Sequence, residues 1–280
     1  MPTLSAVITA AAGVLARAGV ASPRVDAELL AAHVLGVSRA RLLTAPPFPP
    51  AAAAEFDRLV ASRARRIPLQ HLTGTAPFYG RELAVGPGVF IPRFETELLV
   101  EWALSGGPAS RVVDLCAGSG AIAISVALAM PLTEVYCVEA APSAMPWLRQ
   151  NVARLAPGVQ VVIGDVTDPA VLAALDGTAD LVLCNPPYVP EAAPVDTEVR
   201  DHDPHDAVFA GDDGLALMPG IARRAAALLR PGGRLGIEHD DTQGASLPAL
   251  LRATGWFTGV IDHHDLAGRP RFVTAERVAD

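Results

Sequence analysis

The chain has 280 residues, enough for one large or two modest domains, and its composition of 51% hydrophobic and 19% charged residues excludes intrinsic disorder. No apolar run approaches the roughly 20 residues of a bilayer span, and the first 20 residues lack the features of a signal peptide, so we expect a cytoplasmic protein with no membrane partner. The net charge is −8, and this acidity disfavours direct binding of nucleic acid.

The N-terminal part, residues 1–75, has the periodicity of a small all-α domain. Gly19 is placed to end a first helix, and Ser22-Pro23 suits the N-cap and first position of a second. The helical segments expected here are 3–18, 23–35, 39–43 and 51–66. This part shows no catalytic signature, and residues 1–80 carry eight Arg against four acidic residues, a balance of +4 that leaves −12 for the remainder. Its expected role is recognition or packing.

The predicted secondary structure changes after residue 75. Residues 76–94 are predicted to form a β-hairpin connector that turns around Gly80-Arg81, and residues 95–280 a single larger domain. From residue 111 onward, short apolar runs alternate with helical patterns, which indicates an α/β fold with a doubly wound, mostly parallel sheet. The expected strands are 111–115, 134–138, 159–163, 181–184, 233–238, 257–261 and 271–275. The expected helices are 95–104, 121–129, 143–155, 214–229 and 244–253.

A glycine-containing loop follows the first strand of this alternation. Gly118 and Gly120 allow a tight turn and a close approach of the backbone to a ligand. With Ala123 the spacing also fits a dinucleotide fingerprint, so NAD binding stays open as an alternative. Glu139 ends the second strand, where an acid can accept hydrogen bonds from ribose hydroxyls. The loop residues expected at the cofactor are Asp114, Cys116, Ala117, Gly118, Ser119 and Gly120.

Two further acidic positions belong to this cofactor hypothesis. A carboxylate that ends a buried strand, as Asp114 does, is costly to leave unpaired, and the ammonium of an amino-acid cofactor would pair it. Asp165 can accept a hydrogen bond from an adenine amino group, and Val166 offers an apolar wall for the ring. A role for Asp165 as a helix N-cap over 166–172 is an equally open alternative.

The most informative segment is the tetrapeptide Asn185-Pro186-Pro187-Tyr188, which directly follows an apolar strand. An amide nitrogen is a poor nucleophile because its lone pair is delocalised. Oxygen acceptors from Asn185 and from the Pro186 carbonyl would steady the charge that develops on that nitrogen during methylation. Proline stiffens the loop, and Tyr188 can lie against a planar substrate. The tetrapeptide therefore predicts methyl transfer to an amide or amino nitrogen, with Asn185 also facing the cofactor.

The five histidines beyond residue 200 raise the question of a metal site. They lie on expected loops or strand ends, and the methyl-transfer chemistry needs no metal. We expect no metal site.

Together these residues carry a resemblance that covers essentially the whole chain. Segments 114–120, Glu139 and 185–188 resemble class I S-adenosylmethionine-dependent methyltransferases that modify exocyclic or amide nitrogens. The Asn-Pro-Pro-Tyr motif is shared with DNA adenine-N6 methyltransferases. The upstream half narrows the match, because it resembles the peptide chain release factor glutamine methyltransferases. The segments that carry this narrower match are 68–74, 78–80, 90–97 and 265–269, with the N-terminal helices.

This resemblance implies a Rossmann-like, seven-stranded, mostly parallel sheet with a small N-terminal helical domain for substrate recognition. It implies methylation of the side-chain amide nitrogen (N5) of the glutamine in the Gly-Gly-Gln loop of class I peptide chain release factors. S-adenosyl-L-methionine would be the cofactor and S-adenosyl-L-homocysteine the product. Phe90 would line the substrate slot with Pro187, Tyr188 and the two acceptor residues.

The sequence departs from the family pattern at four places. Phe94 stands where proline is usual, Cys116-Ala117 replace a more glycine-rich loop start, Asp203 replaces a glutamate and Asp240 replaces a glycine. The alternatives within the same chemistry are a glutamine of a ribosomal protein and a nucleic-acid adenine. An NAD-dependent oxidoreductase and a non-catalytic adaptor of the translation machinery are the alternatives from other classes.

Overall fold

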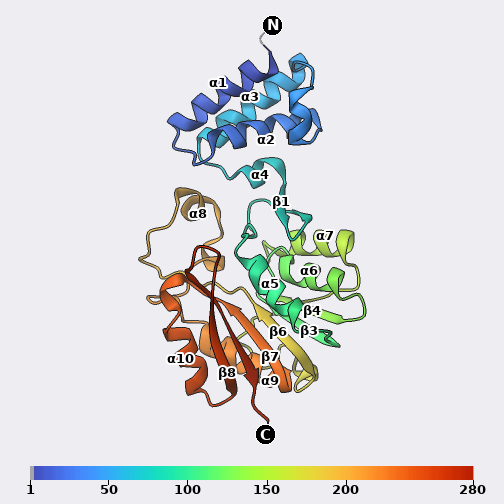
Figure 1. Ribbon diagram of the computed structural model, residues 1–280, viewed down its shortest axis with the longest axis vertical. Helices are drawn as coiled ribbons and strands as arrows, with labels where there is room; N and C mark the ends of the chain where they lie inside the picture. The colour runs from blue at the N-terminus through green and yellow to red at the C-terminus, as the bar shows by residue number, and fades with distance from the viewer. Residues whose placement is uncertain (1–2, 280) are drawn as a thin grey trace. The chain divides into compact units, whose positions relative to one another are not determined.

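The computed structural model describes residues 3–279, which form two compact units (Figure 1). One unit holds the residues up to Thr75 together with the distant segment Val195–His202. The other holds Ala76–Pro194 and the residues from Asp203 onward. The segment Val195–His202 falls within the range expected for the larger domain, yet its contacts place it in the helical unit.

The helical unit is held together by apolar faces of its three longer helices. Leu15 on α1, Leu30 on α2 and Phe56 on α3 are almost completely buried in one cluster. Gly36 takes the left-handed conformation that ends α2. The helices of this unit are α1 (Leu4–Arg17), α2 (Pro23–Leu35), the 3-10 helix η1 (Arg39–Leu43), α3 (Pro50–Ala64), α4 (Leu69–Thr73) and α8 (Thr197–His202).

A chain of ion pairs ties the segment Val195–His202 to this unit. Arg63 is buried and pairs with Asp26 at 2.7 Å and with Glu198 at 2.7 Å. Arg66 pairs with the same oxygen of Glu198 at 2.8 Å and with Asp196 at 2.9 Å. Two of the arginines behind the positive balance of residues 1–80 are therefore neutralised by acids from far along the chain.

The larger unit is built on a seven-stranded sheet with strand order β5-β4-β3-β6-β7-β9-β8. All neighbours pair in parallel except those involving β9, which is antiparallel to both β7 and β8. The predicted seven-stranded, mostly parallel sheet is confirmed. Its strands are β3 (Arg111–Leu115), β4 (Glu134–Glu139), β5 (Gln160–Ile163), β6 (Ala179–Cys184), β7 (Leu229–Glu238), β8 (Phe257–His264) and β9 (Pro270–Arg277), and a separate hairpin pairs β1 (Thr75–Phe78) with β2 (Arg81–Ala84).

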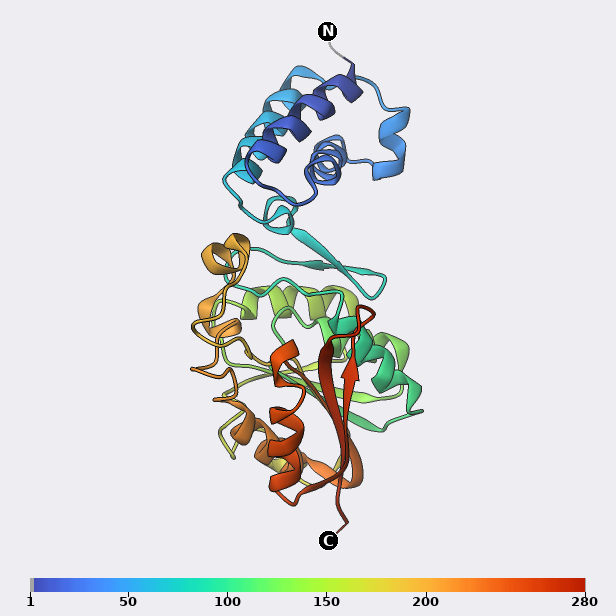
Figure 2. The same ribbon diagram turned by 60° about the vertical axis from the view of Figure 1, so that its left-hand side comes forward.

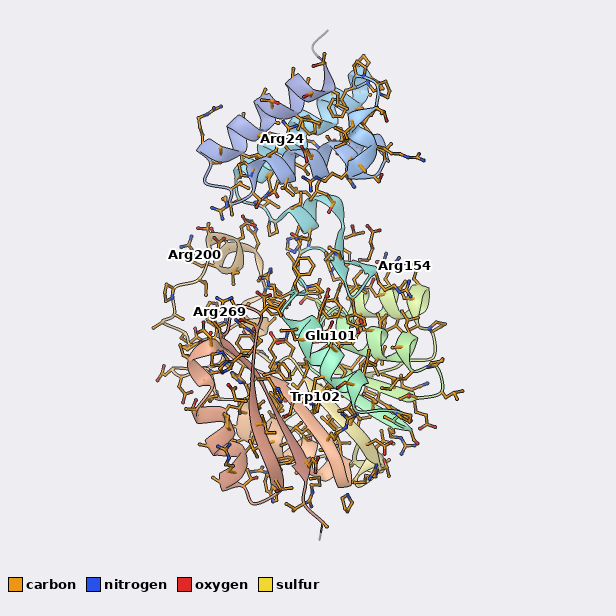
Figure 3. The ribbon with its side chains drawn as sticks, viewed as in Figure 1. Arg24, Glu101, Trp102, Arg154, Arg200 and Arg269 are labelled. Carbon is orange, nitrogen blue, oxygen red and sulfur yellow. The ribbon has the colours of Figure 1, made fainter. Side chains whose placement is uncertain are left out.

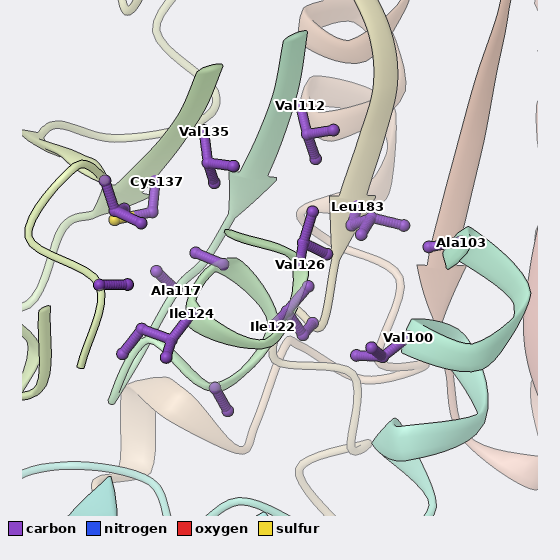
Figure 4. Close-up of a cluster of buried hydrophobic side chains, with 14 of the residues drawn as sticks. Val100, Ala103, Val112, Ala117, Ile122, Ile124, Val126, Val135, Cys137 and Leu183 are labelled. Carbon is purple, nitrogen blue, oxygen red and sulfur yellow. The ribbon is translucent and has the colours of Figure 1, made fainter. Parts of the chain in front are cut away.

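Helices cover both faces of this sheet because consecutive strand residues alternate between two apolar clusters. Val112 packs toward α5 and α6, and Figure 4 shows it near Val126 and Leu183 in that cluster. Val113 packs toward the other face, which α9 and α10 cover. Helix α10 runs beside β8 in both ribbon views (Figure 1, Figure 2). The helices are α5 (Thr96–Ser105), α6 (Ala121–Ala129), α7 (Met145–Leu155), α9 (Met218–Leu228) and α10 (Ser246–Ala253).

A partly buried tryptophan of α5 packs against this core cluster and adds to the contact between α5 and the sheet. Trp102, labelled in Figure 3, lies under the guanidinium of Arg234 at 5.1 Å from the ring centroid. This cation–π contact joins α5 to β7. Within residues 3–279, no helix has both the length and the apolarity needed to cross a bilayer.

Three expectations about elements are corrected by the structure. The helix expected from 214 begins only at Met218, because Gly214 forms a turn against the tetrapeptide loop. The 166–172 segment forms turns, so Asp165 is not a helix N-cap. The Ser22 side chain makes no capping hydrogen bond, although Pro23 does open α2. The short helix α4 was not expected from the sequence.

Candidate functional site

The candidate site lies along the carboxyl ends of four neighbouring strands. In the sheet, β3 stands between β4 and β6, and β7 follows β6. Parallel strands end at the same edge, so this order places Glu139, the loop after β3, Asn185 and Glu238 in a row. Strands β4 and β5 lie on one side of β3, and β6 and β7 lie on the other, so the strand order reverses at β3, which is where open α/β sheets bind ligands.

The loop after β3 owes its shape to left-handed backbone conformations. Cys116, Gly118 and Gly120 have φ angles of 63°, 56° and 87°. A Cβ on Gly120 would lie 2.8 Å from a methyl of Leu148, whereas one on Gly118 would have no atom within 4 Å. Gly120 is therefore needed for packing, and Gly118 faces open space where a ligand could approach.

Glu139 holds this loop in place through its carboxylate. One oxygen accepts from the Gly118 N–H at 2.7 Å, and the other accepts from the Ala141 N–H at 2.7 Å. The side chain is only 8% exposed. A carboxylate oxygen has a second lone pair, so Glu139 can shape the loop and still accept a hydrogen bond from a ligand.

Asp114 is completely buried at the end of β3 and incompletely paired. Its Oδ2 accepts from the Ala123 N–H in the first turn of α6 at 3.0 Å, and its Oδ1 has no hydrogen-bond partner among the described residues. Burial, helped by the charge of Glu139, raises the pKa of this carboxyl from 3.8 to about 8, although the Ala123 hydrogen bond acts in the opposite direction. An orphaned acceptor of this kind fits the ammonium of an amino-acid cofactor.

Asp165 and Val166 follow β5 on the far side of Glu139. The Gly164 N–H donates to the Glu139 backbone carbonyl at 3.1 Å, which brings this turn next to the cofactor loop. Asp165 is exposed and accepts from both the backbone N–H and the hydroxyl of Thr167, and these bonds lower its pKa. Val166 is buried in the cluster that also contains Val138.

On the other side of β3, Asn185 presents a single free acceptor. Its Nδ2 donates to the Thr96 hydroxyl oxygen at 3.0 Å. Its Oδ1 has no hydrogen-bond partner within residues 3–279, and this oxygen is not buried. It is therefore open to a ligand. An exposed carbonyl oxygen on a side chain fixed at its other end can receive an N–H from a substrate.

Contacts to Tyr188 fix the rest of the tetrapeptide loop. The Tyr188 hydroxyl donates to Oε1 of Glu238 at 2.8 Å. The buried Gln243 donates through Nε2 to the Tyr188 carbonyl at 2.9 Å, and its own Oε1 accepts from the Asp240 N–H. A Cβ on Gly214 would lie 2.0 Å from the same Tyr188 carbonyl, so only glycine allows this approach. Asp240, where the family has glycine, caps the turn that carries Gln243.

Phe90, expected in the substrate slot, is half-buried in the segment that precedes α5. The Arg93 guanidinium lies over its ring at 4.7 Å from the centroid and pairs with Asp203 at 2.6 Å. Asp203 thus serves as the partner of Arg93 despite its departure from the family's glutamate. Phe94, the other departure here, is 68% exposed.

Four buried polar residues at this edge were not expected from the sequence: Thr96, Asn151, Glu238 and Gln243. Asn151 bonds both the N–H and the carbonyl of Ala84 and also the Ser119 carbonyl, so it joins the hairpin to the cofactor loop. Among these four residues, only Glu238 could have been found from the sequence pattern, because it is an acid at the end of a predicted strand, as Glu139 is. Thr96, Asn151 and Gln243 lie within helices or turns, where nothing in the sequence pattern separates them from solvent-facing residues.

Four of the five histidines beyond residue 200 have protein partners: His205, His239, His263 and His264. His239 bonds Asp262 at 2.9 Å and the Asp240 carbonyl at 2.8 Å, and His263 bonds the Thr274 hydroxyl at 2.8 Å and stacks on Phe272. In residues 3–279, no group of three or more His, Cys, Asp or Glu side chains is arranged to hold a metal ion.

Comparison with known proteins places both units. Residues 6–74 match the family described as PrmC N-terminal domain, and residues 84–200 match the family described as methyltransferase small domain. Among solved structures, the chain is similar to a T. thermophilus 16S rRNA N2 G1207 methyltransferase in complex with AdoMet and guanosine, with a TM-score of 0.48, 21% identity and coverage of 74% of this chain and 45% of that one.

Curated relatives match over almost their full length. The chain is 52% identical over 281 residues to the release factor glutamine methyltransferase of Mycolicibacterium smegmatis, covering 100% of this chain and 99% of the relative. It is 45% identical to the protein of the same name from Streptomyces coelicolor and 41% identical to that from Deinococcus radiodurans, with at least 96% of each chain covered. The chain belongs to the release factor glutamine methyltransferase family.

Proposed function

We propose that this protein transfers a methyl group from S-adenosyl-L-methionine to the side-chain amide nitrogen of the glutamine in the Gly-Gly-Gln loop of class I peptide chain release factors. The observation that carries the proposal is the free Oδ1 of Asn185, fixed by its own amide group to Thr96 at 3.0 Å. This acceptor stands beside a cofactor loop that contains an unpartnered buried carboxylate oxygen at Asp114. Family membership selects glutamine among the nitrogen acceptors that such a site can hold.

The residues of the cofactor side would hold S-adenosylmethionine, which supplies an electrophilic methyl group when bound. Asp114 would pair with its ammonium, Glu139 would accept from the ribose hydroxyls, and Gly118 would allow the backbone to approach. Asp165 and Val166 would meet the adenine. The residues present fit this group, because Asp114 Oδ1 lacks a partner and a Cβ on Gly118 would point into open space.

The tetrapeptide would bind and orient the acceptor. Asn185 Oδ1 and the Pro186 carbonyl accept hydrogen bonds from the amide NH₂, and they hold the nitrogen in line with the methyl group. Orientation of this kind contributes on the order of 7–11 kcal/mol in favourable intramolecular cases. The acceptors also stabilise positive charge on the nitrogen as the bond forms. Tyr188 and Phe90 would flank the planar amide, and the methylated amide then loses its proton to solvent.

We assign recognition of the release factor to the helical unit. Residues 6–74 match the family described as PrmC N-terminal domain, and residues 1–80 carry a balance of +4, which Glu198 and Asp196 reduce through their ion pairs with Arg63 and Arg66. The segment Val195–His202, which closely follows the tetrapeptide, is bound to this unit through Glu198. Recognition and chemistry are therefore joined by the chain directly downstream of the amide site.

The test is methyl transfer from labelled S-adenosylmethionine to purified, unmodified release factor. A second release factor, in which the loop glutamine is replaced by alanine, is the matched control. We expect label on the first protein only, mapped to the loop glutamine by mass spectrometry. Equal label on both, or label on neither, would contradict the proposal.

A further inference from the structure

The new inference concerns how Asn185 is held, and it rests on the proposed function. Three polar side chains meet behind the amide site: Asn185 after β6, Thr96 at the start of α5 and Glu238 at the end of β7. Cys184 and Ile237 are register partners in neighbouring parallel strands, so the residues that follow them, Asn185 and Glu238, emerge side by side. Thr96 is 3% exposed and Glu238 is 1% exposed.

The hydrogen-bond polarity of this group can be worked out from donors and acceptors. Thr96 has one hydroxyl proton, and its oxygen already accepts from Asn185 Nδ2 at 3.0 Å. Glu238 is acceptor-only when ionised, and its Oε1 takes the proton of the Tyr188 hydroxyl at 2.8 Å. Its Oε2 is buried and has no hydrogen bond of standard geometry within residues 3–279. Candidate donors to that oxygen are the Thr96 proton and Arg271 Nε, which is also buried without a partner within residues 3–279. Thr96 is the one that binds Asn185, and its proton is assigned to Oε2.

The electrostatics of Glu238 agree with this assignment. Burial raises its pKa, while hydrogen bonding by the Thr96 and Tyr188 hydroxyls and the positive charge of Arg271 lower it. Arg271 is itself paired with Asp265 at 3.1 Å. The Tyr188 hydroxyl therefore occupies one oxygen of this buried acid, and the other oxygen is left for a second donor.

We propose that Glu238 and Thr96 are positioning residues that set the direction of the Asn185 amide. Glu238 accepts the Thr96 proton, which leaves the Thr96 oxygen as an acceptor only. That oxygen binds the NH₂ end of Asn185, so the carbonyl end must face the substrate. If the Thr96 proton pointed at Asn185 instead, the side chain would present its NH₂ group to an amide nitrogen that is also a donor, and the substrate could not bind productively.

The first test reverses the direction of the hydrogen bonds in the Glu238–Thr96–Asn185 chain, called the relay below, without changing the size of any side chain. In Glu238→Gln, the remaining oxygen can take the Tyr188 proton and the new NH₂ group must donate to Thr96. Thr96 then donates to Asn185 and turns its NH₂ group outward. We expect kcat/KM for the release factor to fall about 100-fold or more, as for loss of an aligned transition-state hydrogen bond. The Kd for S-adenosylmethionine should stay within about twofold.

The second test restores the correct polarity in the reversed relay. Adding Asn185→Asp to Glu238→Gln gives Thr96 an acceptor for its proton and returns an oxygen to the substrate side, with the same total charge as the wild type. We expect the double variant to recover at least about tenfold of the lost kcat/KM. A purely structural role for Glu238 predicts the opposite, because the double variant would then be worse than either single one.

Substitutions at Thr96 provide the matched controls. Thr96→Val keeps the shape and removes the relay, and should lose activity to the extent of Glu238→Gln. Thr96→Ser keeps the hydroxyl and should retain activity within about threefold. Tyr188→Phe removes the other hydrogen bond to Glu238 without reversing Thr96, so its loss should be about tenfold or less.

The outcomes separate the two proposals. Wild-type protein that fails to label the release factor overturns the proposed function. An active wild type, together with a Glu238→Gln variant of unchanged kcat/KM or a double variant that recovers nothing, overturns the relay. Thermal unfolding of every variant shows whether a loss of activity reflects loss of the fold.

Discussion

The two sides of the candidate site are built by different kinds of contact. On the side of β3 and β4, carboxylates accept from backbone N–H groups, as Glu139 does from Gly118 at 2.7 Å. On the side of β6 and β7, side chains bond to other side chains, as Asn185 does to Thr96 and Tyr188 to Glu238. The cofactor side draws its residues from neighbouring stretches of the chain, whereas the acceptor side joins segments about 90 and 50 residues apart.

This difference determines which substitutions each side tolerates. A site made of backbone N–H groups depends on the path of the chain, so a side chain can change wherever its φ angle remains accessible. A site made of linked side chains depends on the proton arrangement of each member, so one isosteric change can alter the whole group. The Cys116-Ala117 departure falls on the tolerant side, and no family departure falls on Asn185, Thr96 or Glu238.

The largest expected effect is at Asn185, and the chain offers Asn151 as its counterpart. Asn185→Ala removes an acceptor for the substrate, and we expect kcat to fall about 100- to 1000-fold with the cofactor Kd nearly unchanged. Asn151→Ala leaves buried groups of Ala84 and Ser119 without partners, and should cost about 2–3 kcal/mol in the free energy of unfolding. Steady-state methyl transfer and urea denaturation measure the two effects, and matching profiles for both variants would remove the distinction.

Particular residues show how far the sequence could predict this site. Gly118, Gly120, Glu139 and Asn185 can be predicted because each lies at the end of a strand or in the loop that follows it, and strand ends follow from apolar periodicity. Thr96 was not found, because its role exists only once α5 packs against β6 and β7.

The backbone of the fold was predicted for a similar reason. Each predicted strand from 111 onward contains a local apolar run, and β3 and α6 have the predicted bounds, whereas the polar start of β7 and the polar end of β8 were not predicted. The attachment of the segment Val195–His202 to the helical unit was not predicted, since it depends on the pairing of Glu198 with Arg63, which are 135 residues apart. Long-range pairs of charged groups leave no periodic signal in the sequence.

The second-largest effect is expected at Asp114. Asp114→Asn removes the proposed partner of the cofactor ammonium, and we expect the Kd for S-adenosylmethionine to rise about 10- to 100-fold, as for loss of a charge-assisted hydrogen bond. Its pKa of about 8 means that the ligand-free protein holds a proton there at pH 7. Pairing with an ammonium requires the ionised form, so binding should release up to about one proton. Calorimetry in buffers of different ionisation enthalpy measures this number.

The same shift predicts how stability depends on pH. Because the folded pKa of Asp114 is raised above 3.8 to about 8, the folded ligand-free protein binds more protons than the unfolded chain between these values. Its contribution to stability is therefore greatest below pH 4 and is lost as the pH rises through 8. Asp114→Asn should flatten the dependence of unfolding free energy on pH between 5 and 8, and an unchanged slope would contradict the assignment.

A smaller effect separates Gly118 from Gly120. Both have positive φ, so alanine at either site should cost about 1–2 kcal/mol in stability. The added methyl at 120 would press on Leu148 and Ile124, whereas that at 118 meets no protein atom within 4 Å. We expect Gly120→Ala to lower the melting temperature more and Gly118→Ala to weaken cofactor binding more. The reverse pattern would show that the open space beside Gly118 does not receive the cofactor.

The smallest effect is expected at Cys116, where the comparison between the two sides is most easily broken. Its φ of 63° is one that glycine adopts without strain, so Cys116→Gly relieves about 1 kcal/mol of strain. The substitution also increases the freedom of the unfolded chain by a similar amount, so stability should change little. If the loop acts through its backbone, the Kd for S-adenosylmethionine should stay within about twofold. A tenfold loss of affinity would show that the thiol takes part, and the cofactor side would then depend on side chains as the acceptor side does.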